Sequence, residues 1–200
     1  MGRALLFTGV KKVGKTTALR NVVTRLAPKS VVGFYATERR IDGKRVGFEI
    51  EMLDGRSGRL ASIDSDSDMR VGRLLSHGRL KYGVDLEFLD GVAVPALRAS
   101  LSNNPGGIVL VDEIGPMQLY SAAFRQVVLD MLESPCLILG TVMSPAEPWV
   151  DVLKEHEAVE TFHLTPQNRD TVTEMMCLYL EKRVLTMSAS YGMPPPPSAA

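Results

Sequence analysis

Residues 4–17 read Ala-Leu-Leu-Phe-Thr-Gly-Val-Lys-Lys-Val-Gly-Lys-Thr-Thr, a short apolar run that leads into a glycine-containing loop. From Gly9 to Thr16 the loop matches the pattern G-x-x-x-x-G-K-[ST], known as the Walker A motif or P-loop. Apolar residues then recur at helical spacing until Pro28. In this order of strand, glycine loop and helix, backbone N–H groups and the positive end of the helix dipole bind phosphate oxygens. The sequence therefore predicts a polyphosphate site.

The P-loop predicts a nucleotide-binding set and part of a metal site. The expected nucleotide-binding residues are Gly9, Val10, Lys11, Lys12, Val13, Gly14, Lys15 and Thr16. Lys15 is expected to reach the β- and γ-phosphates as a point charge, and the Thr16 hydroxyl is expected to ligate Mg2+. Lys11 and Lys12 add positive charge to the loop, although lysine head groups usually stay in water.

A second motif supplies carboxylates. Residues 108–111 form a continuous apolar run, typical of a strand buried on both faces, and Asp112 and Glu113 follow it. Downstream of a P-loop this is a Walker B candidate, in which Asp112 holds Mg2+ and Glu113 polarises the attacking water. Ligands of open α/β sheets bind beyond the carboxyl ends of the strands, so both motifs are expected at one edge of the sheet.

Apolar runs alternate with helix-period segments along the chain, which predicts an α/β protein with a mostly parallel sheet. The strands are expected at 4–8, 31–35, 108–111 and 136–139, and the helices at 19–26, 89–97, 124–132 and from Thr165 onward. Residues 46–53 and 60–63 flank Asp54-Gly55, a turn signal that predicts a small antiparallel hairpin insertion. The polar stretch from Ile63 to Arg79 is expected to be a mobile loop. We assign residues 1–186 to one domain and the proline-rich residues 187–200 to a disordered tail.

The amino-acid composition indicates which binding partners and which cell compartment to expect. The chain has 200 residues, 45% of them hydrophobic, which suffices for one buried core. Its 23 basic residues balance 23 acidic ones, so no overall field attracts nucleic acid or membrane, and neither is expected as a partner. Two cysteines without metal-ligand spacing indicate a reducing compartment, and no apolar run approaches the roughly 18 residues of a membrane span. We therefore expect a cytoplasmic protein.

Several short motifs together resemble a known family. They are residues 9–17, Gly33-Phe34-Tyr35, Gly47-Phe48, residues 111–117, Gly140-Thr141 and Asn168-Arg169, in the same order as in the nucleoside-triphosphatase family first described from thermophiles. The resemblance implies a three-layer P-loop fold with an extra strand between the P-loop and Walker B strands. It also implies slow, base-tolerant hydrolysis of ATP, GTP and related triphosphates. The family's phosphate, metal and water-activating positions would fall on Lys15, Thr16, Thr17, Asp112, Glu113 and Arg169, which adds Thr17 to the nucleotide-binding set.

The chain departs from the family pattern in three places. Val10-Lys11-Lys12 replaces a run such as Pro-Pro-Gly, and if residue 12 needs a positive φ, a lysine costs about 1–2 kcal/mol there. Ala36-Thr37-Glu38 replaces Thr-Glu-Glu, so only Glu38 keeps an acidic match. The stretch from Arg70 to Tyr82 is longer than usual, which would enlarge a lid.

Two further residues are candidates for contact with the transferred phosphoryl group. Arg169 lies near the start of the last predicted helix, where its guanidinium would neutralise developing charge. The alternative is a structural pair with a carboxylate. Thr141 ends a predicted strand and would either sense the γ-phosphate or serve as an ordinary strand-end hydroxyl.

Our hypothesis is a Mg2+-dependent nucleoside-triphosphatase in which Glu113, Lys15 and Arg169 are catalytic and Thr16 and Asp112 hold the metal. A kinase that phosphorylates a nucleoside or small metabolite would use the same residues. A nucleotide-gated interaction module, in which the stretch from Ile63 to Arg79 orders on binding, is a third possibility. The base preference, any protein partner and the oligomeric state are not encoded in a recognisable motif.

Overall fold

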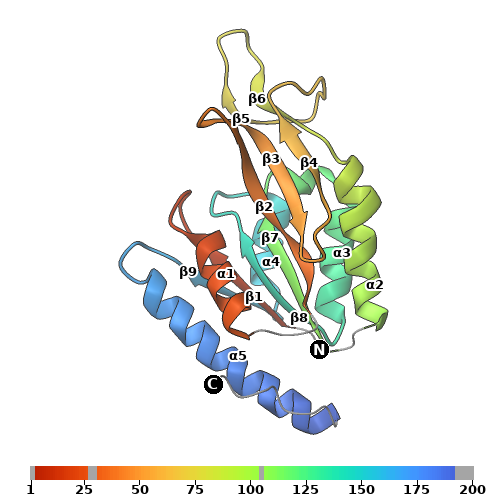
Figure 1. The fold of residues 1–200 in the computed structure, drawn as a ribbon, viewed down its shortest axis with the longest axis vertical. Helices are drawn as coiled ribbons and strands as arrows, with labels where there is room; N and C mark the ends of the chain where they lie inside the picture. The colour runs from red at the N-terminus through yellow and green to blue at the C-terminus, as the bar shows by residue number, and fades with distance from the viewer. Residues whose placement is uncertain (1–2, 27–30, 104–105, 192–200) are drawn as a thin grey trace.

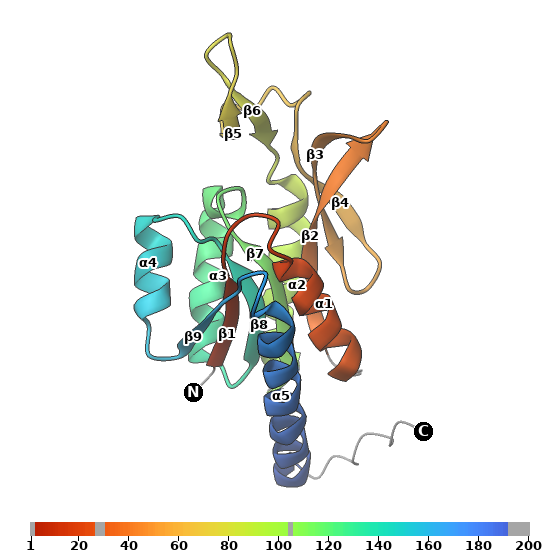
Figure 2. The same cartoon turned by 90° about the vertical axis from the view of Figure 1, so that its left-hand side faces the viewer.

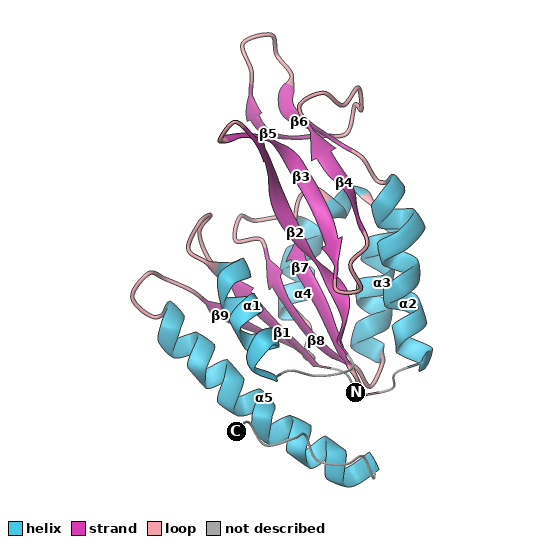
Figure 3. Ribbon diagram, viewed as in Figure 1, coloured by secondary structure: helices cyan, strands magenta, loops and turns pink. Residues whose placement is uncertain are grey.

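A computed structural model describes residues 3–26, 31–103 and 106–191. Within these residues the strands form one nine-stranded sheet in the order β5-β6-β4-β3-β2-β7-β8-β1-β9 (Figures 1 and 3). The parallel half consists of β2 (Val31–Ile41), β7 (Ile108–Ile114), β8 (Leu137–Val142), β1 (Arg3–Thr8) and β9 (Val159–His163). Strand β8 lies between the P-loop strand β1 and the Walker B strand β7, so the predicted extra strand is confirmed.

Helices cover both faces of the parallel half, which confirms the three-layer α/β prediction (Figure 2). On one face lie α1 (Lys15–Leu26) and α5 (Arg169–Tyr191), and on the other α2 (Val94–Asn103), α3 (Ala122–Glu133) and α4 (Pro148–Glu155). The short helices η1 (Leu89–Ala93) and η2 (Gln118–Tyr120) lie on the second face. Pro95 lies inside a helical stretch that is continuous from residue 87 to residue 103, and the π-helical turn η1 directly before it accommodates a residue without an N–H. The strand β9 and the helix α4 are elements that the sequence reasoning did not predict.

The antiparallel half of the sheet is larger than the predicted hairpin. It contains β3 (Lys44–Met52), β4 (Ser57–Ser62), β6 (Leu80–Val84) and β5 (Arg70–Leu74). The prediction of a mobile loop from Ile63 to Arg79 is wrong for β5, which pairs with β6. These residues show no clear polar–apolar alternation, and the strand forms because its backbone pairs with β6 and because Arg70 donates to the carbonyl oxygens of Leu80 and Lys81.

The last helix follows a capped turn. The Thr165 hydroxyl accepts from the Asn168 N–H at 3.2 Å, and the Asn168 side-chain oxygen accepts from the Thr165 N–H at 2.7 Å. Helix α5 then begins at Arg169 and continues to Tyr191, so the tail predicted from residue 187 is wrong for residues 187–191. The sequence offers no helix breaker before Gly192, which explains the longer helix. The rest of the predicted tail lies outside the described residues.

Candidate active site

The P-loop connects β1 to α1 at the carboxyl edge of the sheet. Lys15 is the first residue of α1, and its Nζ donates to the Gly9 carbonyl oxygen at 3.1 Å. Lys12 has φ 68°, so residue 12 does take the left-handed conformation in which a lysine is strained. Val13 is 5% exposed and anchors the loop in the core. The loop therefore curls over Lys15 as a phosphate-binding loop does.

Asp112 lies in the buried end of β7, with 2% of its surface exposed. Its Oδ1 accepts from the Thr141 hydroxyl of β8 at 2.6 Å, whereas no donor meets Oδ2 with hydrogen-bonding geometry in the described chain. Burial raises the pKa of Asp112, and the nearby Thr141 and Thr16 hydroxyls and the Lys15 charge lower it without cancelling that effect. Thr141 thus contacts the Walker B carboxylate.

Glu113 faces the lysine of the P-loop. Its Oε1 lies 4.0 Å from Lys15 Nζ, and its side chain is 30% exposed. Burial raises the pKa of Glu113, the positive charges of Lys15 and Lys11 lower it, and the negative charge of Asp112 raises it further. The structure therefore brings together the four central predicted residues, which are Lys15, Thr16, Asp112 and Glu113.

Arg169 reaches the same loop from the far end of the sequence. Its Nη1 donates to the Val13 carbonyl oxygen at 3.3 Å, and its Nε contacts Asp170 Oδ1 at 3.1 Å. A Cβ added to Gly14 would lie 2.9 Å from Arg169 Cδ, so the arginine packs directly on the P-loop. Arg169 therefore pairs with a carboxylate and borders the phosphate loop, and its role in the reaction stays a prediction.

The remaining predicted residues lie at the rim or elsewhere. Val10 is 62% exposed, and Lys11, Lys12 and Thr17 are also exposed. Glu38 lies on the β2–β3 hairpin, where it accepts from Arg40 and Arg45. Glu38 therefore belongs to an ion-pair network of the hairpin.

Sequence reasoning missed a polar network next to Asp112. Tyr35 of β2 is in register with Asp112, and the Arg20 guanidinium lies 4.0 Å from the centroid of its ring. Arg20 also donates to Glu51 at 3.2 Å, and the Thr37 hydroxyl donates to the same carboxylate at 2.9 Å. One available signal was the helical period, which places Arg20 one turn after Thr16 on α1.

The donor set fits a divalent cation. Asp112 Oδ2 is buried without a donor, the Thr16 hydroxyl lies close to the Asp112 carboxylate, and hard cations such as Mg2+ prefer oxygen ligands of this kind. Thr16 and Asp112 are thus the residues that would hold the metal, and this assignment stays a prediction.

Comparisons with known proteins decide the family. The model of the NTPase family matches residues 4–177. The chain belongs to this nucleoside-triphosphatase family. Nucleoside-triphosphatase THEP1 of Thermotoga petrophila is 36% identical over 89% of this chain and 92% of its own. The human cancer-related nucleoside-triphosphatase is 34% identical over 85% of this chain and 92% of its own.

Two solved structures of the NTPase family share the fold. The crystal structure of THEP1 from Aquifex aeolicus covers 88% of this chain and 96% of its own with a TM-score of 0.73 at 29% identity. The solution structure of the human protein covers 90% of this chain and 98% of its own with a TM-score of 0.72 at 31% identity. Like its relatives, this NTPase is an enzyme that hydrolyses nucleoside triphosphates.

In the part of the chain that the structure describes, no helix is both long and apolar enough to span a membrane.

Proposed function

We propose that the enzyme hydrolyses ATP, GTP and other nucleoside triphosphates to the diphosphate and phosphate, slowly, in a Mg2+-dependent reaction in the cytoplasm. The observation that carries the proposal is the approach of Glu113 Oε1 to within 4.0 Å of Lys15 Nζ. It places a carboxylate beside the ammonium group that binds the β- and γ-phosphates in P-loop enzymes. We infer that the enzyme accepts different nucleobases, because the residues assigned above are placed to bind the phosphates and the metal and not the base.

Each residue then has one task in the reaction. The loop N–H groups and Lys15 bind the phosphate oxygens. Glu113 accepts a proton from a water molecule while the oxygen of that water attacks the γ-phosphorus. The bond from that phosphorus to the β–γ bridging oxygen breaks, and the electron pair leaves with the diphosphate. Mg2+, held by Thr16 and Asp112, would neutralise charge on the phosphate oxygens.

Arg169 supports the same step from the other side of the loop. Its guanidinium lies against Gly14, and among the side chains that the structure describes the exposed Asp170 is the one carboxylate in contact with it. Exposed pairs of this kind are weak, so the guanidinium is available to a phosphate oxygen. We assign Arg169 the neutralisation of charge on the transferred phosphoryl group.

The test is Glu113→Gln, which keeps the shape of the side chain but removes its basicity. Phosphate release should fall about 10²- to 10³-fold, while the dissociation constant for a fluorescent ATP analogue changes less than about threefold. Glu38→Gln is the matched control, because Glu38 is bonded to Arg40 and Arg45 on the hairpin, and its turnover should equal that of the wild type. Undiminished turnover in Glu113→Gln would refute the assignment of Glu113.

A further inference from the structure

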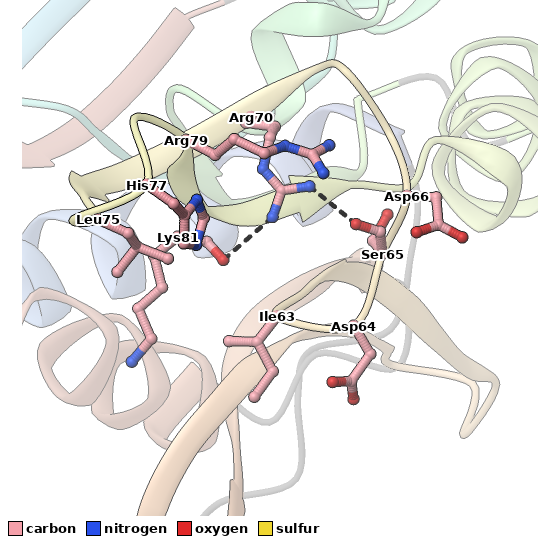
Figure 4. Close-up of a pocket in the computed structure, with 9 residues that line it drawn as sticks. All are labelled: Ile63, Asp64, Ser65, Asp66, Arg70, Leu75, His77, Arg79 and Lys81. Atoms are coloured by element: carbon pink, nitrogen blue, oxygen red, sulfur yellow. Dashed lines mark hydrogen bonds between the residues drawn. The ribbon is translucent and has the colours of Figure 1, made fainter.

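A cavity lies beside the hairpin formed by β5 and β6. It has a volume of about 460 Å3, between the loop of residues 63–66 and the hairpin (Figure 4). Pockets that hold small molecules usually have volumes of roughly 300–1,000 Å3. The P-loop, Asp112 and Glu113 take no part in its walls, so the NTPase site does not account for it.

The hairpin is strongly basic in a chain of zero net charge. Residues 69–84 contain Arg70, Arg73, His77, Arg79 and Lys81 but no carboxylate. All of these except Arg73 line the cavity. The charge is therefore concentrated at the cavity.

Arg70 is a fixed cation in the wall. It donates to the carbonyl oxygens of Leu80 at 2.7 Å and Ser65 at 2.8 Å, and more weakly to those of Ser67 and Lys81. These neutral acceptors hold the guanidinium in place but leave its charge uncompensated. No carboxylate forms an ion pair with Arg70 or Lys81 within residues 3–25, 31–103 and 106–182, for which side chains are described.

The acidic residues near the cavity do not cancel this charge. Arg79 contacts Asp68 at 3.9 Å, but the Asp68 side chain is fully exposed, so water screens the pair. Asp64 and Asp66 line one end, and Figure 4 shows their carboxylates directed away from the guanidinium groups of Arg70 and Arg79.

Two apolar side chains, Ile63 and Leu75, also line the cavity (Figure 4). Arginine, lysine and histidine side chains are the usual partners of phosphate oxygens, and apolar side chains suit a carbon skeleton. A volume of about 460 Å3 is within the range of small-molecule sites, so we favour a small ligand as the occupant.

We propose that this cavity binds a small phosphate ester, with Arg79 and His77 contacting the phosphate and Ile63 and Leu75 contacting the carbon skeleton. Arg70 holds the wall of the cavity in place through its hydrogen bonds to backbone carbonyl oxygens, and its positive charge attracts the phosphate. The site is separate from the P-loop and is built by residues 63–66 and by the hairpin of β5 and β6.

The experiment measures binding of AMP and of ribose 5-phosphate by calorimetry, with adenosine as the ligand that lacks phosphate. AMP and ribose 5-phosphate have no β-phosphate for Lys15 to bind. We expect saturable binding of at least one phosphate ester and none of adenosine. Arg79→Ala should weaken binding by about tenfold or more, the usual scale of a lost charge-assisted hydrogen bond. Lys15→Ala should leave it unchanged.

Arg73→Ala is the matched control, because it removes the same charge from the same hairpin at a side chain outside the cavity, and it should weaken binding less than about threefold. The His77 ring resonances of the unaltered protein should shift on titration, which reports the site without any substitution. The proposal is overturned if neither ester binds, if Arg73→Ala weakens binding as much as Arg79→Ala, or if Lys15→Ala abolishes it. Binding of an RNA oligomer without binding of either ester would also overturn it.

Discussion

Thr141→Val removes the one hydroxyl that donates to Asp112 Oδ1 at 2.6 Å, while it keeps the volume of a fully buried side chain. Oδ2 already has no donor, so the variant leaves a buried carboxylate without a direct hydrogen bond. A hydrogen bond to a charged group contributes about 1.5–3 kcal/mol, and we expect the free energy of unfolding to fall by that amount. For a domain of this length the melting temperature should fall by about 3–12 °C.

The assay is urea unfolding at pH 7.5 without nucleotide or Mg2+, run as a double-mutant cycle with Asp112→Asn. With a neutral amide at position 112, the cost of Thr141→Val should fall to about 0.5–1.5 kcal/mol, the range for a neutral hydrogen bond. Thr141→Ser is the control, since it keeps the hydroxyl and loses only a methyl group, at about 1 kcal/mol. If Thr141→Val lowers the free energy of unfolding equally with Asp and with Asn at position 112, the stabilisation does not come from a hydrogen bond to a charged carboxylate.

Two further predictions concern the P-loop and the hairpin. Lys12→Gly should raise the free energy of unfolding by about 1 kcal/mol, because the φ of 68° at residue 12 suits glycine. The control is Lys11→Gly, which loses the same charge and should give no gain in stability. Thermal unfolding of the two variants measures the difference. Burial acts to raise the pKa of Glu38, but hydrogen bonds from Arg40 and Arg45 outweigh burial and hold this pKa below its ordinary value of 4.5. The pairing of Glu38 with the two arginines therefore stabilises the fold above pH 4.5, and the stabilisation is lost as the pH falls below 4.5. In Glu38→Gln the free energy of unfolding should therefore be lower than in the wild type above pH 4.5 and should fall less steeply as the pH drops below it, as urea unfolding at several pH values would measure; an equal pH dependence would contradict the ion-pair assignment.

Local motifs predicted which residues lie together at the edge of the sheet. The glycine pattern from Gly9 to Thr16 and the run ending in Asp112 and Glu113 each lie within a few consecutive residues, so their geometry follows from one loop and one strand. The strand between them in the sheet, β8, was predicted from the resemblance to the NTPase family and is observed.

Long-range contacts were not predictable in the same way. The strand β5 lies in a stretch read as a loop, because its pairing with β6 is made by backbone atoms and by Arg70, and no periodicity marks it. The network of Arg20, Tyr35 and Glu51 depends on the register of β2 and β3 and on the packing of α1 against them.

The amino-acid sequence alone determined that this chain has a P-loop, a Walker B strand and an α/β core, because these features depend on residues that are neighbours in the chain. Tertiary structure decided which groups meet: Arg169 contacts Val13 across 156 positions, and Thr141 contacts one oxygen of Asp112 but not the other. It also created the basic cavity beside β5 and β6. Such contacts depend on how distant elements pack, and packing reflects the burial of all their side chains at once.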